Sequence, residues 1–282
     1  MGSLSTTESL PAHIPFHTLD IFRLNSRTII VTGAIGGLGV QAVTAILESG
    51  GDVICIDRPE IPPETEWGRL KNLAESNGAQ ILYYSCDITD EATVGLLFEE
   101  AAEQARFPVR GLVTCAGITR VGPSIKFPLA EARRVIDINL VGTLAAAQAA
   151  ARIVEKQALP ASFVFIASMS GHIINKGAPN AAYCVSKAGV HQLARNLAYE
   201  WGGSPELPCI RVNSISPGYI KTKMTQSYIE QADLEKIWLE DSMLKRFSEP
   251  EEYRGTIVYM LSDASSYMTG SDVRVDGGHT AC

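Results

Sequence analysis

The sequence predicts an α/β protein of doubly wound architecture, in which a seven-stranded, mostly parallel sheet carries helices on both faces. Short runs rich in β-branched residues alternate with longer helical segments, which is typical of parallel sheets. The runs are nearly continuously apolar, as expected for strands covered on both sides. At 282 residues, the chain suits one large domain better than two independent ones. We therefore expect a single domain.

The alternation assigns the elements in order. Seven strands are expected at residues 28–32, 53–57, 81–85, 111–114, 163–167, 210–214 and 272–275. Six helical segments are expected at residues 38–49, 66–77, 91–105, 130–159, 183–201 and 250–261. Residues 1–26 lack periodicity and are expected as an extension on the surface, followed by a catalytic domain at 27–282. Within that domain, residues 219–246 carry Met224, Tyr228 and Trp238 and are expected to form a substrate lid.

Composition narrows the class of partner. A formal net charge of −7 and a pI near 5.3 argue against binding to nucleic acid or to an anionic membrane surface, and favour a small molecule. The six cysteines are scattered, without CxxC pairs or nearby histidines, so no metal site is predicted. Neither a secretory signal nor an apolar stretch of about 20 residues is visible, so we expect a cytoplasmic protein.

The first expected strand runs into a glycine-rich turn and then an apolar helix. The turn reads Thr32-Gly33-Ala34-Ile35-Gly36-Gly37-Leu38-Gly39. Glycines at such a turn let the backbone approach a pyrophosphate, whose charge is favoured by the free N–H groups at a helix start. An ordinary glycine loop would explain this motif if it stood alone. Together with its strand, its helix and the following strand, it predicts a dinucleotide site of Rossmann type.

The second expected strand ends in Asp57, near the offset of about 20 residues at which a carboxylate binds the ribose hydroxyls. A carboxylate there repels the 2′-phosphate of NADP, so we favour NAD. Arg58 acts in the opposite direction, because its guanidinium can neutralise such a phosphate or stack on the adenine. NADP therefore remains an alternative.

Several motifs follow the glycine turn in a fixed order. They are Asp87-Ile88, Cys115-Ala116-Gly117, Asn139, Ser168, Tyr183-Cys184-Val185-Ser186-Lys187 and Pro217-Gly218. With the TGxxxGxG spacing of the turn, they make the chain from about Arg27 to its end resemble the short-chain dehydrogenase/reductase family. Residues 169–187 and 214–224 are most similar to fungal polyol and sugar-alcohol dehydrogenases of that family.

The resemblance implies roles in cofactor binding. Gly33, Gly37 and Gly39 would line the pyrophosphate, and Thr222 would bind the nicotinamide carboxamide. Asp87 and Ile88 would hold the adenine. The other implied cofactor contacts are Ile35, Leu38, Ala116, Gly117, Tyr183, Lys187, Pro217, Gly218 and Ile220. Two have plain alternatives: Asp87 as a turn or helix-cap residue, and Thr222 as the N-cap of a helix starting near Lys223.

One motif departs from the family pattern. The family usually has Asn-Ala-Gly where this chain has Cys115-Ala116-Gly117. The change removes a side-chain amide that would help tie neighbouring strands together. Because that amide supports the sheet and the cofactor cavity, we expect altered local geometry but retained chemistry.

Tyr183 and Lys187 are four residues apart on one helix face. A phenol has a pKa of about 10, and a nearby ammonium favours its ionised form. At roughly 4 Å and an effective dielectric near 20, the attraction is about 4 kcal/mol, or about three pKa units. A packed ring beside a solvated amine would explain such a pair if it stood alone. Its place after the glycine turn favours catalysis.

Ser168 ends an apolar run, where strand ends meet ligands in open α/β sheets. Ser170 is the alternative, and a turn-forming serine explains either. By the resemblance, Ser168 holds the substrate oxygen while Tyr183 acts as acid/base. Lys187 lowers the pKa of Tyr183 and anchors the ribose, and Asn139 links the proton chain to solvent.

These features predict an NAD(P)-dependent oxidoreductase that interconverts a secondary alcohol and a ketone. The substrate is expected to meet loop 172–176 and the lid. A polyol or sugar alcohol is favoured; the alternatives are an apolar secondary-metabolite alcohol or ketone and, from another class, a non-catalytic NAD-binding sensor. Because the family is commonly dimeric or tetrameric, we expect a homodimer or homotetramer.

Overall fold

The central sheet has seven strands. The computed structural model describes residues 17–281, excepting the side chains of residues 227, 229 and 232. The strand order is β3-β2-β1-β4-β5-β6-β7, and every neighbouring pair is parallel. The bounds are β1 Thr28–Thr32, β2 Asp52–Asp57, β3 Ile81–Ser85, β4 Val109–Thr114, β5 Ala161–Ile166, β6 Ile210–Pro217 and β7 Asp272–Val275. The predicted doubly wound fold is confirmed.

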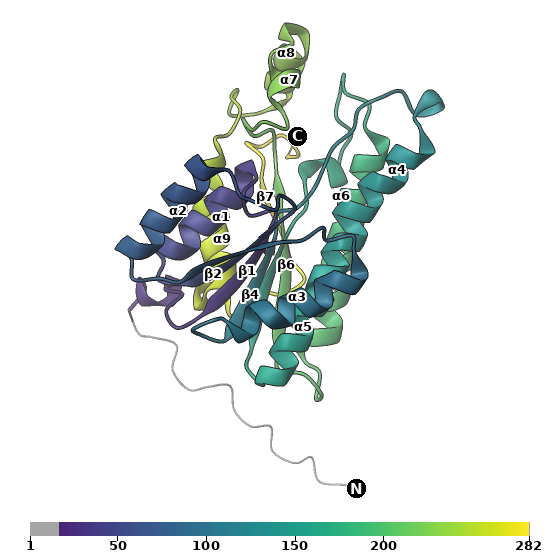
Figure 1. The fold of residues 1–282 in the computed structure, drawn as a ribbon. Coiled ribbons are helices and arrows are strands. Elements are labelled where there is room, and N and C mark those ends of the chain that lie inside the picture. Colours follow the sequence, from purple (N-terminus) through teal and green to yellow (C-terminus); the bar gives the residue numbers. More distant parts are fainter. Residues whose placement is uncertain (1–16, 282) are drawn as a thin grey trace, which may run out of the picture.

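Helices cover both faces of this sheet (Figure 1). One layer holds α1 Gly37–Glu48, α2 Glu64–Ser76 and α9 Arg254–Leu261, with η5 Pro250–Tyr253 and η6 Asp263–Ser265 beside α9. The other holds α3 Glu91–Glu103, α4 Leu129–Ile136, η3 Asp137–Val141, α5 Gly142–Gln157 and α6 Ala181–Gly202. The short elements η1 Asp20–Phe22, η2 Ser124–Lys126, η4 Met169–Gly171, α7 Gln226–Ile229 and α8 Ala232–Asp241 lie in the connections.

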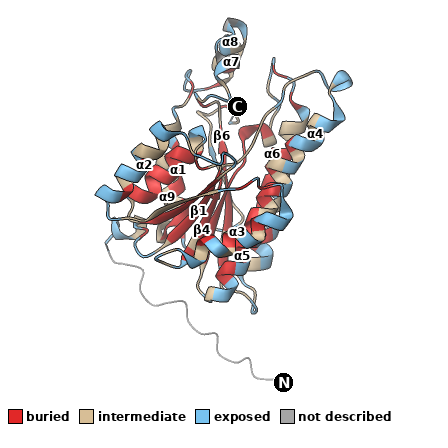
Figure 2. Ribbon diagram, in the orientation of Figure 1, coloured by how far each residue is buried: buried red, intermediate tan, exposed pale blue. Residues whose placement is uncertain are grey.

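The sheet separates two apolar cores. Every residue of β1 and β5 is buried, which explains why their sequences are continuously apolar rather than alternating. The edge strands β3 and β7 are only partly buried. In Figure 2 the helices are buried toward the sheet and exposed on their outer sides. Within residues 17–281, no helix is both long and apolar enough to cross a bilayer.

Most element ends differ by one to three residues from those expected, and two expectations differ by more. The helical segment expected at 130–159 contains a π-helical turn, Asp137–Val141, between α4 and α5. Leu24 lies within the expected extension, yet it is fully buried, and its N–H donates to the carbonyl oxygen of Ser49 at 2.9 Å. The packed part of the chain therefore starts before residue 27. A single buried leucine leaves no periodic pattern in the sequence, so the sequence did not indicate it. Residues 1–16 of the extension lie outside the described residues.

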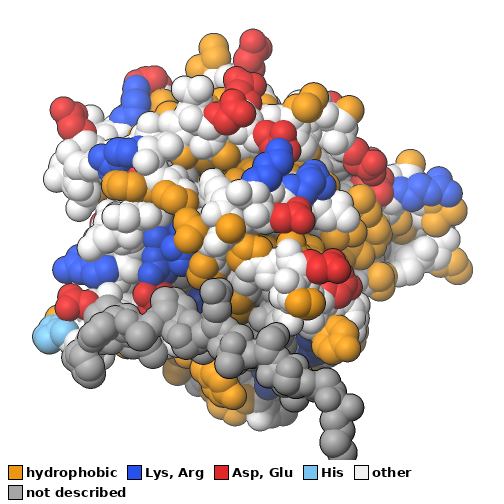
Figure 3. Space-filling view, turned by 90° about the horizontal axis from the view of Figure 1, so that it is seen from below, with side chains coloured by type: hydrophobic (Ala, Val, Ile, Leu, Met, Phe, Trp, Pro, Cys, Tyr) orange, Lys and Arg blue, Asp and Glu red, His pale blue; other side chains and the backbone are white. Residues whose placement is uncertain are grey.

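Charge is mixed on the face turned away from the carboxyl ends of the strands. In Figure 3, acidic and basic side chains are interspersed there among apolar ones. A face with both signs of charge does not create the uniformly positive potential that would attract a polyanion.

Candidate active site

The candidate site lies at the carboxyl ends of the strands, where the strand order reverses between β1 and β4. In open α/β sheets, ligands bind in the crevice at this point, because the connecting segments diverge to opposite faces. The glycine turn follows β1, and Cys115-Ala116-Gly117 follows β4. The fold therefore brings together two motifs that are more than 70 residues apart in the sequence.

The glycine turn has the shape and donors that a pyrophosphate needs. Gly33 has φ +65°, and a Cβ there would lie 2.5 Å from the backbone nitrogen of Ala116. At Gly39, a Cβ would lie 2.0 Å from the carbonyl oxygen of Gly33. Helix α1 begins at Gly37 without a side-chain cap, so its first N–H groups can bind an anion. These residues fit a dinucleotide, with Ile35 and Leu38 in the same turn.

Asp57 ends β2 beside this turn, as the sequence predicted. Its carboxylate accepts the N–H of Ile35 at 2.9 Å and the N–H of Arg58 at 2.7 Å. A carboxylate has about four acceptor positions, so others stay available for ribose hydroxyls. Arg58 is exposed and, after other contributions, helps to hold the pKa of Asp87 low. The opposing charges of Asp57 and Arg58 therefore lie at the same end of the crevice.

Asp87 and Ile88 follow β3 at the outer end of the crevice. The Asp87 carboxylate accepts the N–H of Thr89 at 3.0 Å and its hydroxyl at 2.7 Å, and these bonds lower the pKa of Asp87. Ile88 is buried, and its Cδ1 would lie 2.7 Å from a Cβ at Gly142. Asp87 thus forms a local turn, which was one of the two expected readings. Its second carboxylate oxygen has no bond recorded among the described residues.

Tyr183 and Lys187 both lie in the first two turns of α6. The Lys187 ammonium is 5.8 Å from the centre of the Tyr183 ring and donates to the carbonyl oxygen of Ile166 at 2.7 Å. Burial raises the pKa of Tyr183, although its side-chain hydrogen bond with Ser168 lowers it. Burial also lowers the pKa of Lys187 to about 8.

The net shift of the Tyr183 pKa is upward, whereas the sequence predicted a lowering by Lys187. A buried phenolate loses its hydration, which the sequence could not reveal. In the structure, burial is the largest influence on the pKa of the phenol and shifts it upward.

Asn139 is fully buried in the π-helical turn. Its side chain accepts the N–H of Ile118 at 2.8 Å and donates to the carbonyl oxygen of Ile118 at 2.9 Å and to the hydroxyl of Ser186 at 2.9 Å. The amide therefore ties the loop after β4 to the segment between Tyr183 and Lys187. A Cβ at Gly117 would lie 3.2 Å from the Asn139 oxygen and 3.7 Å from the Lys187 nitrogen.

Ser168 follows β5 and is the N-cap of η4. Its hydroxyl accepts the N–H of Ser170 at 3.1 Å and donates to the Ser170 hydroxyl at 3.1 Å. The Ser170 hydroxyl donates to Asn175 Oδ1 at 3.0 Å. Both serines are buried, so the fold places both candidate hydroxyls at the site.

A pocket with about 490 Å³ of empty space opens beside these residues. Its polar lining comprises Thr119, Ser168, Ser170, Asn175, Asn180, Tyr183, Tyr219, Thr225 and Tyr228, and its apolar lining includes Val121, Met169, Ala178, Met224 and Trp238. Of loop 172–176, which was expected to meet substrate, Asn175 lines the pocket, whereas Ile174 is 76% exposed. His172 instead contacts Asp272.

Residues 219–246, which were expected to form a lid, follow β6 in the sequence. The strand β6 ends at Pro217 and is followed by Gly218. Ile220 pairs with Ser248, and α7 and α8 stand at the top of Figure 1. A Cβ at Gly37 would lie 3.0 Å from Thr222 Cγ2, so Thr222 lies against the start of α1. The helix after Thr222 starts at Gln226, so Thr222 is not its N-cap.

Trp238 joins residues 219–246 to the loop at 172–176. Its ring stacks on Tyr219 with centroids 4.0 Å apart, and its indole N–H donates to the carbonyl oxygen of Lys176 at 2.9 Å. The Lys176 ammonium pairs with Asp241 at 2.8 Å. The lid is thus joined to the loop that follows Ser168 and Ser170.

Cys115 replaces the usual asparagine without loosening the strands. Its N–H donates to the carbonyl oxygen of Thr32 at 2.9 Å, so the main chain itself joins the ends of β1 and β4. Burial raises the pKa of the Cys115 thiol to about 12, which keeps it neutral at physiological pH. The Thr32 and Thr114 hydroxyls are buried without a partner among the described residues.

Several residues at the site were not singled out from the sequence for the positions they occupy. Thr119, Asn180 and Thr225 line the pocket, and Ser186 supports Asn139. Ser186 lies inside the predicted Tyr183 to Lys187 motif, so its position in the sequence already indicated that it lies near these two residues. The other three lie on loops or helix ends, whose paths the sequence pattern does not specify.

Comparison with known proteins agrees with this geometry. Residues 33–280 match the family model described as enoyl-(acyl carrier protein) reductase. The short-chain dehydrogenase/reductase notP' of Aspergillus versicolor is 49% identical over 259 residues, which cover 92% of this chain and 89% of that protein. The NADH-dependent L-xylulose reductase of Ambrosiozyma monospora is 36% identical over 274 residues, covering 92% and 97%.

Among solved structures, the NADPH-dependent 3-quinuclidinone reductase of Rhodotorula rubra superposes with a TM-score of 0.88 at 30% identity, and the match covers 100% of both chains. The fold, the geometry of the site and the relatives all indicate the same family. The chain belongs to the short-chain dehydrogenase/reductase family and is an NAD(P)-dependent oxidoreductase that interconverts an alcohol and a ketone.

Proposed function

We propose that this protein interconverts a polyol and the corresponding ketose, with NAD as the preferred cofactor. The observation that carries the proposal is the connected set of polar groups beside Ser168 and Tyr183. The Asn175 oxygen accepts the Ser170 hydroxyl at 3.0 Å and the Tyr219 hydroxyl at 3.4 Å. A substrate with several hydroxyls can add hydrogen bonds to the remaining acceptor positions of these oxygens, whereas the apolar part of a ketone adds none.

The catalytic roles follow from position. The Ser168 hydroxyl holds the substrate oxygen, and the Tyr183 oxygen takes the hydroxyl proton during oxidation or returns it during reduction. The bound nicotinamide supplies the acceptor or donor of the hydride and its two electrons. Loss of one proton to Tyr183 and one hydride to the cofactor converts the carbinol carbon into a carbonyl.

Lys187 and Asn139 support that proton transfer. The buried Lys187 ammonium stabilises the phenolate that forms when the proton leaves Tyr183 and contributes to holding the ribose. Asn139 fixes the Tyr183 to Lys187 segment through Ser186 and, by its place beside Gly117, lies on a route for the proton to solvent. Thr222 and Ile220 contribute to the nicotinamide end, next to Pro217 and Gly218.

We propose residues 219–246 as the substrate lid. Met224, Thr225, Tyr228 and Trp238 come from this segment and line the pocket above the catalytic groups. The indole N–H of Trp238 donates to the carbonyl oxygen of Lys176 at 2.9 Å, which couples the lid to the loop beside the pocket. Closure over a bound substrate would exclude water from the hydride transfer.

The preference for NAD is proposed on the Asp57 carboxylate, which the Ile35 N–H holds beside the ribose end of the turn. An Asp57→Asn variant can keep an oxygen acceptor for the Ile35 N–H, removes the charge, and gives up the acceptor for the Arg58 N–H. We expect its ratio of kcat/KM for NAD over NADP to fall by about tenfold or more, equivalent to about 1.4 kcal/mol. Asp87→Asn is the matched control, and an unchanged ratio in Asp57→Asn would refute the assignment.

We propose a homo-oligomer, dimer or tetramer, on the exposed apolar face formed by η2, α4 and α6. Ile125 is 92% exposed, Leu129 70%, Val185 63% and Tyr199 90%. Val185 and Tyr199 are about four turns apart and so lie on one side of α6. Light scattering should show a dimer or tetramer that Tyr199→Glu weakens and Tyr267→Glu, at an equally exposed site elsewhere, does not. A monomeric wild-type protein would refute this.

The test of the activity is turnover with NAD across matched polyols and apolar secondary alcohols. We expect polyols to be oxidised with higher kcat/KM, and Asn175→Leu to lower that value for polyols more than for apolar alcohols. The stacked Tyr219 and Trp238 rings favour the second candidate, an apolar alcohol or ketone. Preference for apolar substrates that Asn175→Leu improves would establish this candidate and overturn the polyol proposal.

A further inference from the structure

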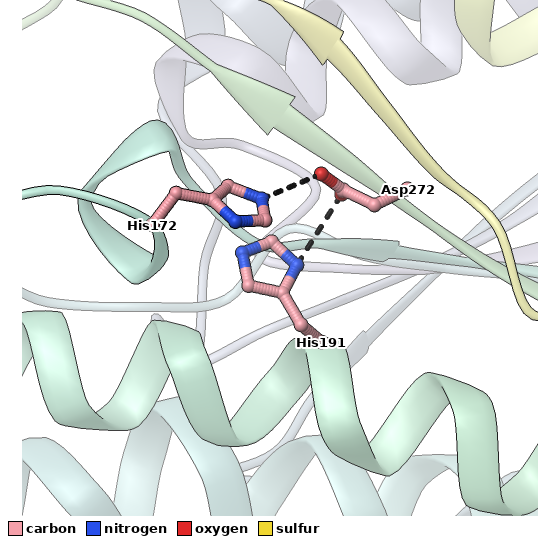
Figure 4. A group of neighbouring side chains, drawn as sticks. All are labelled: His172, His191 and Asp272. Atoms are coloured by element: carbon pink, nitrogen blue, oxygen red, sulfur yellow. Dashed lines mark hydrogen bonds and ion pairs between the residues drawn. The ribbon is translucent and has the colours of Figure 1, made fainter. Parts of the chain in front are cut away.

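Three side chains from distant parts of the chain meet behind the Ser168 to Gly171 turn (Figure 4). His172 follows η4, His191 projects from α6, and Asp272 begins β7. One atom of each residue is a metal ligand by type, and these atoms all lie within 4.8 Å of one another. None of the three belongs to the lining of the substrate pocket. The cluster is therefore separate from the catalytic groups.

The histidine rings face the same carboxylate. His172 Nε2 lies 2.8 Å from Asp272 Oδ2, and His191 Nδ1 lies 3.3 Å from Asp272 Oδ1. The two rings stack with centroids 4.2 Å apart. Figure 4 shows one nitrogen of each ring directed at the Asp272 carboxylate.

Both nitrogens of His191 have neighbours that can bond to them. Its Nε2 lies 3.2 Å from the carbonyl oxygen of Ser168, which can only accept, so an N–H at Nε2 satisfies that oxygen. The Ser214 hydroxyl, 3.4 Å from Nδ1, donates instead to Asp272 Oδ1 at 2.7 Å. With the proton on Nε2, the Nδ1 lone pair faces the Asp272 carboxylate, and a cation between them would bind both.

The separations favour a metal ion over a shared proton at His191. A charge-assisted N–H···O bond is about 2.7 to 2.9 Å long, shorter than the 3.3 Å between His191 and Asp272. Two donors about 2.1 Å from one ion, at right to tetrahedral angles, are about 3.0 to 3.4 Å apart. The 2.8 Å between His172 and Asp272 has to open by about 0.2 Å, which a ring with a 29% exposed side chain permits.

The surroundings match those of metal ligands. The N–H of a metal-bound histidine is usually held by a carbonyl or carboxylate, as Ser168 holds His191 here. The carboxylate is held in turn by the Ser216 hydroxyl, 2.8 and 2.9 Å from its two oxygens. His191 is 4% exposed and positioned by packing, while the more exposed His172 opens a path to solvent.

We propose that His172, His191 and Asp272 bind one divalent transition-metal ion. Two imidazoles and one carboxylate suit Zn²⁺, Co²⁺, Mn²⁺ or Fe²⁺, whereas Mg²⁺ and Ca²⁺ prefer oxygen ligands throughout. The ion joins the turn that carries Ser168 to α6 and β7. Its role is to fix this turn, and it does not contact the substrate.

The test is titration of chelator-treated protein, free of any histidine tag, with Co²⁺ followed by its visible absorption and with Zn²⁺ by competition. We expect one equivalent to bind, a rise in melting temperature with Zn²⁺ and no such rise with Mg²⁺. His172→Gln should weaken binding by about 100-fold or more, because loss of even a supporting residue around a metal ligand costs about 10- to 100-fold. Ser216→Ala should weaken binding by about tenfold.

His17→Gln is the matched control, since His17 is an exposed histidine whose ring lies 4.0 Å from Asp20. It should leave the Co²⁺ titration unchanged. NADH binding by each variant checks its fold, and His172→Gln alters the most exposed ligand, which keeps the test free of core damage. Absence of a stoichiometric site in the wild type, or equal affinity in His172→Gln, would overturn the proposal without bearing on the polyol activity.

Discussion

Replacement of Tyr183 by phenylalanine removes one oxygen atom at the centre of the proposed chemistry. The ring stays in place beside Lys187, whose ammonium lies 5.8 Å from its centre. The Ser168 hydroxyl keeps its bond to Ser170 at 3.1 Å, so no buried hydroxyl loses its last partner. We therefore expect a change in stability of about 1 kcal/mol or less.

The effect on turnover should be much larger. A positioned acid/base contributes about 10²- to 10⁴-fold, so its loss should raise the barrier by about 3 to 5 kcal/mol. The assay is the rate of NADH formation from a polyol under saturating conditions, with NADH binding measured separately by fluorescence. We expect binding to be retained and kcat to fall by that factor.

Tyr219→Phe is the matched control for this variant. Tyr219 also lines the pocket and carries a hydroxyl, which donates to Asn175 at 3.4 Å. Its loss should raise KM for a polyol and leave kcat close to that of the wild type. A Tyr183→Phe enzyme that keeps kcat near the wild-type value would show that another group moves the proton.

Three further predictions follow from the structure. Because burial raises the pKa of Tyr183, kcat/KM for alcohol oxidation should increase from pH about 7 to about 10. Carbonyl reduction uses the protonated phenol, so it should keep its rate as the pH falls through this interval. A kcat/KM for oxidation that does not change with pH would contradict this prediction. Trp238→Ala removes the ring stacked on Tyr219 at a local cost of about 3 to 5 kcal/mol, so KM should rise and proteolysis within the proposed lid should accelerate. Trp238→Phe is the milder control, and an unchanged rate of proteolysis would contradict the prediction. Gly33→Ala places a methyl group 2.5 Å from Ala116, so NADH affinity and melting temperature should both fall; retention of both would show that the turn can shift.

Much of the fold could be predicted because local patterns encode it. The strands at 81–85 and 272–275 were predicted with the bounds that the structure has. Their β-branched and aromatic residues and the flanking turn residues are local signals. The helix around Asn139 was less well predicted, since a π-helical turn depends on the amide bonding to Ile118 and Ser186, which are distant in sequence.

The candidate site was predictable to the extent that its motifs are contiguous. Tyr183 and Lys187 share a helix face because four residues make about one turn, and Gly33 is required by its positive φ. The pocket lining was not predictable, because Thr119, Asn180 and Thr225 come from loops and helix ends placed by packing. Leu24 was misplaced for a similar reason, as a single buried side chain leaves no periodic trace.

The sequence by itself determined the doubly wound fold, the glycine turn with Asp57, and the order of the candidate catalytic residues, because each rests on short-range periodicity or spacing. Tertiary structure alone decided that burial, more than Lys187, governs the pKa of Tyr183. It also brought His172, His191 and Asp272 together across 100 residues. Such contacts depend on the order of strands in the sheet and on which helix face packs against it, and no local pattern in the chain records either.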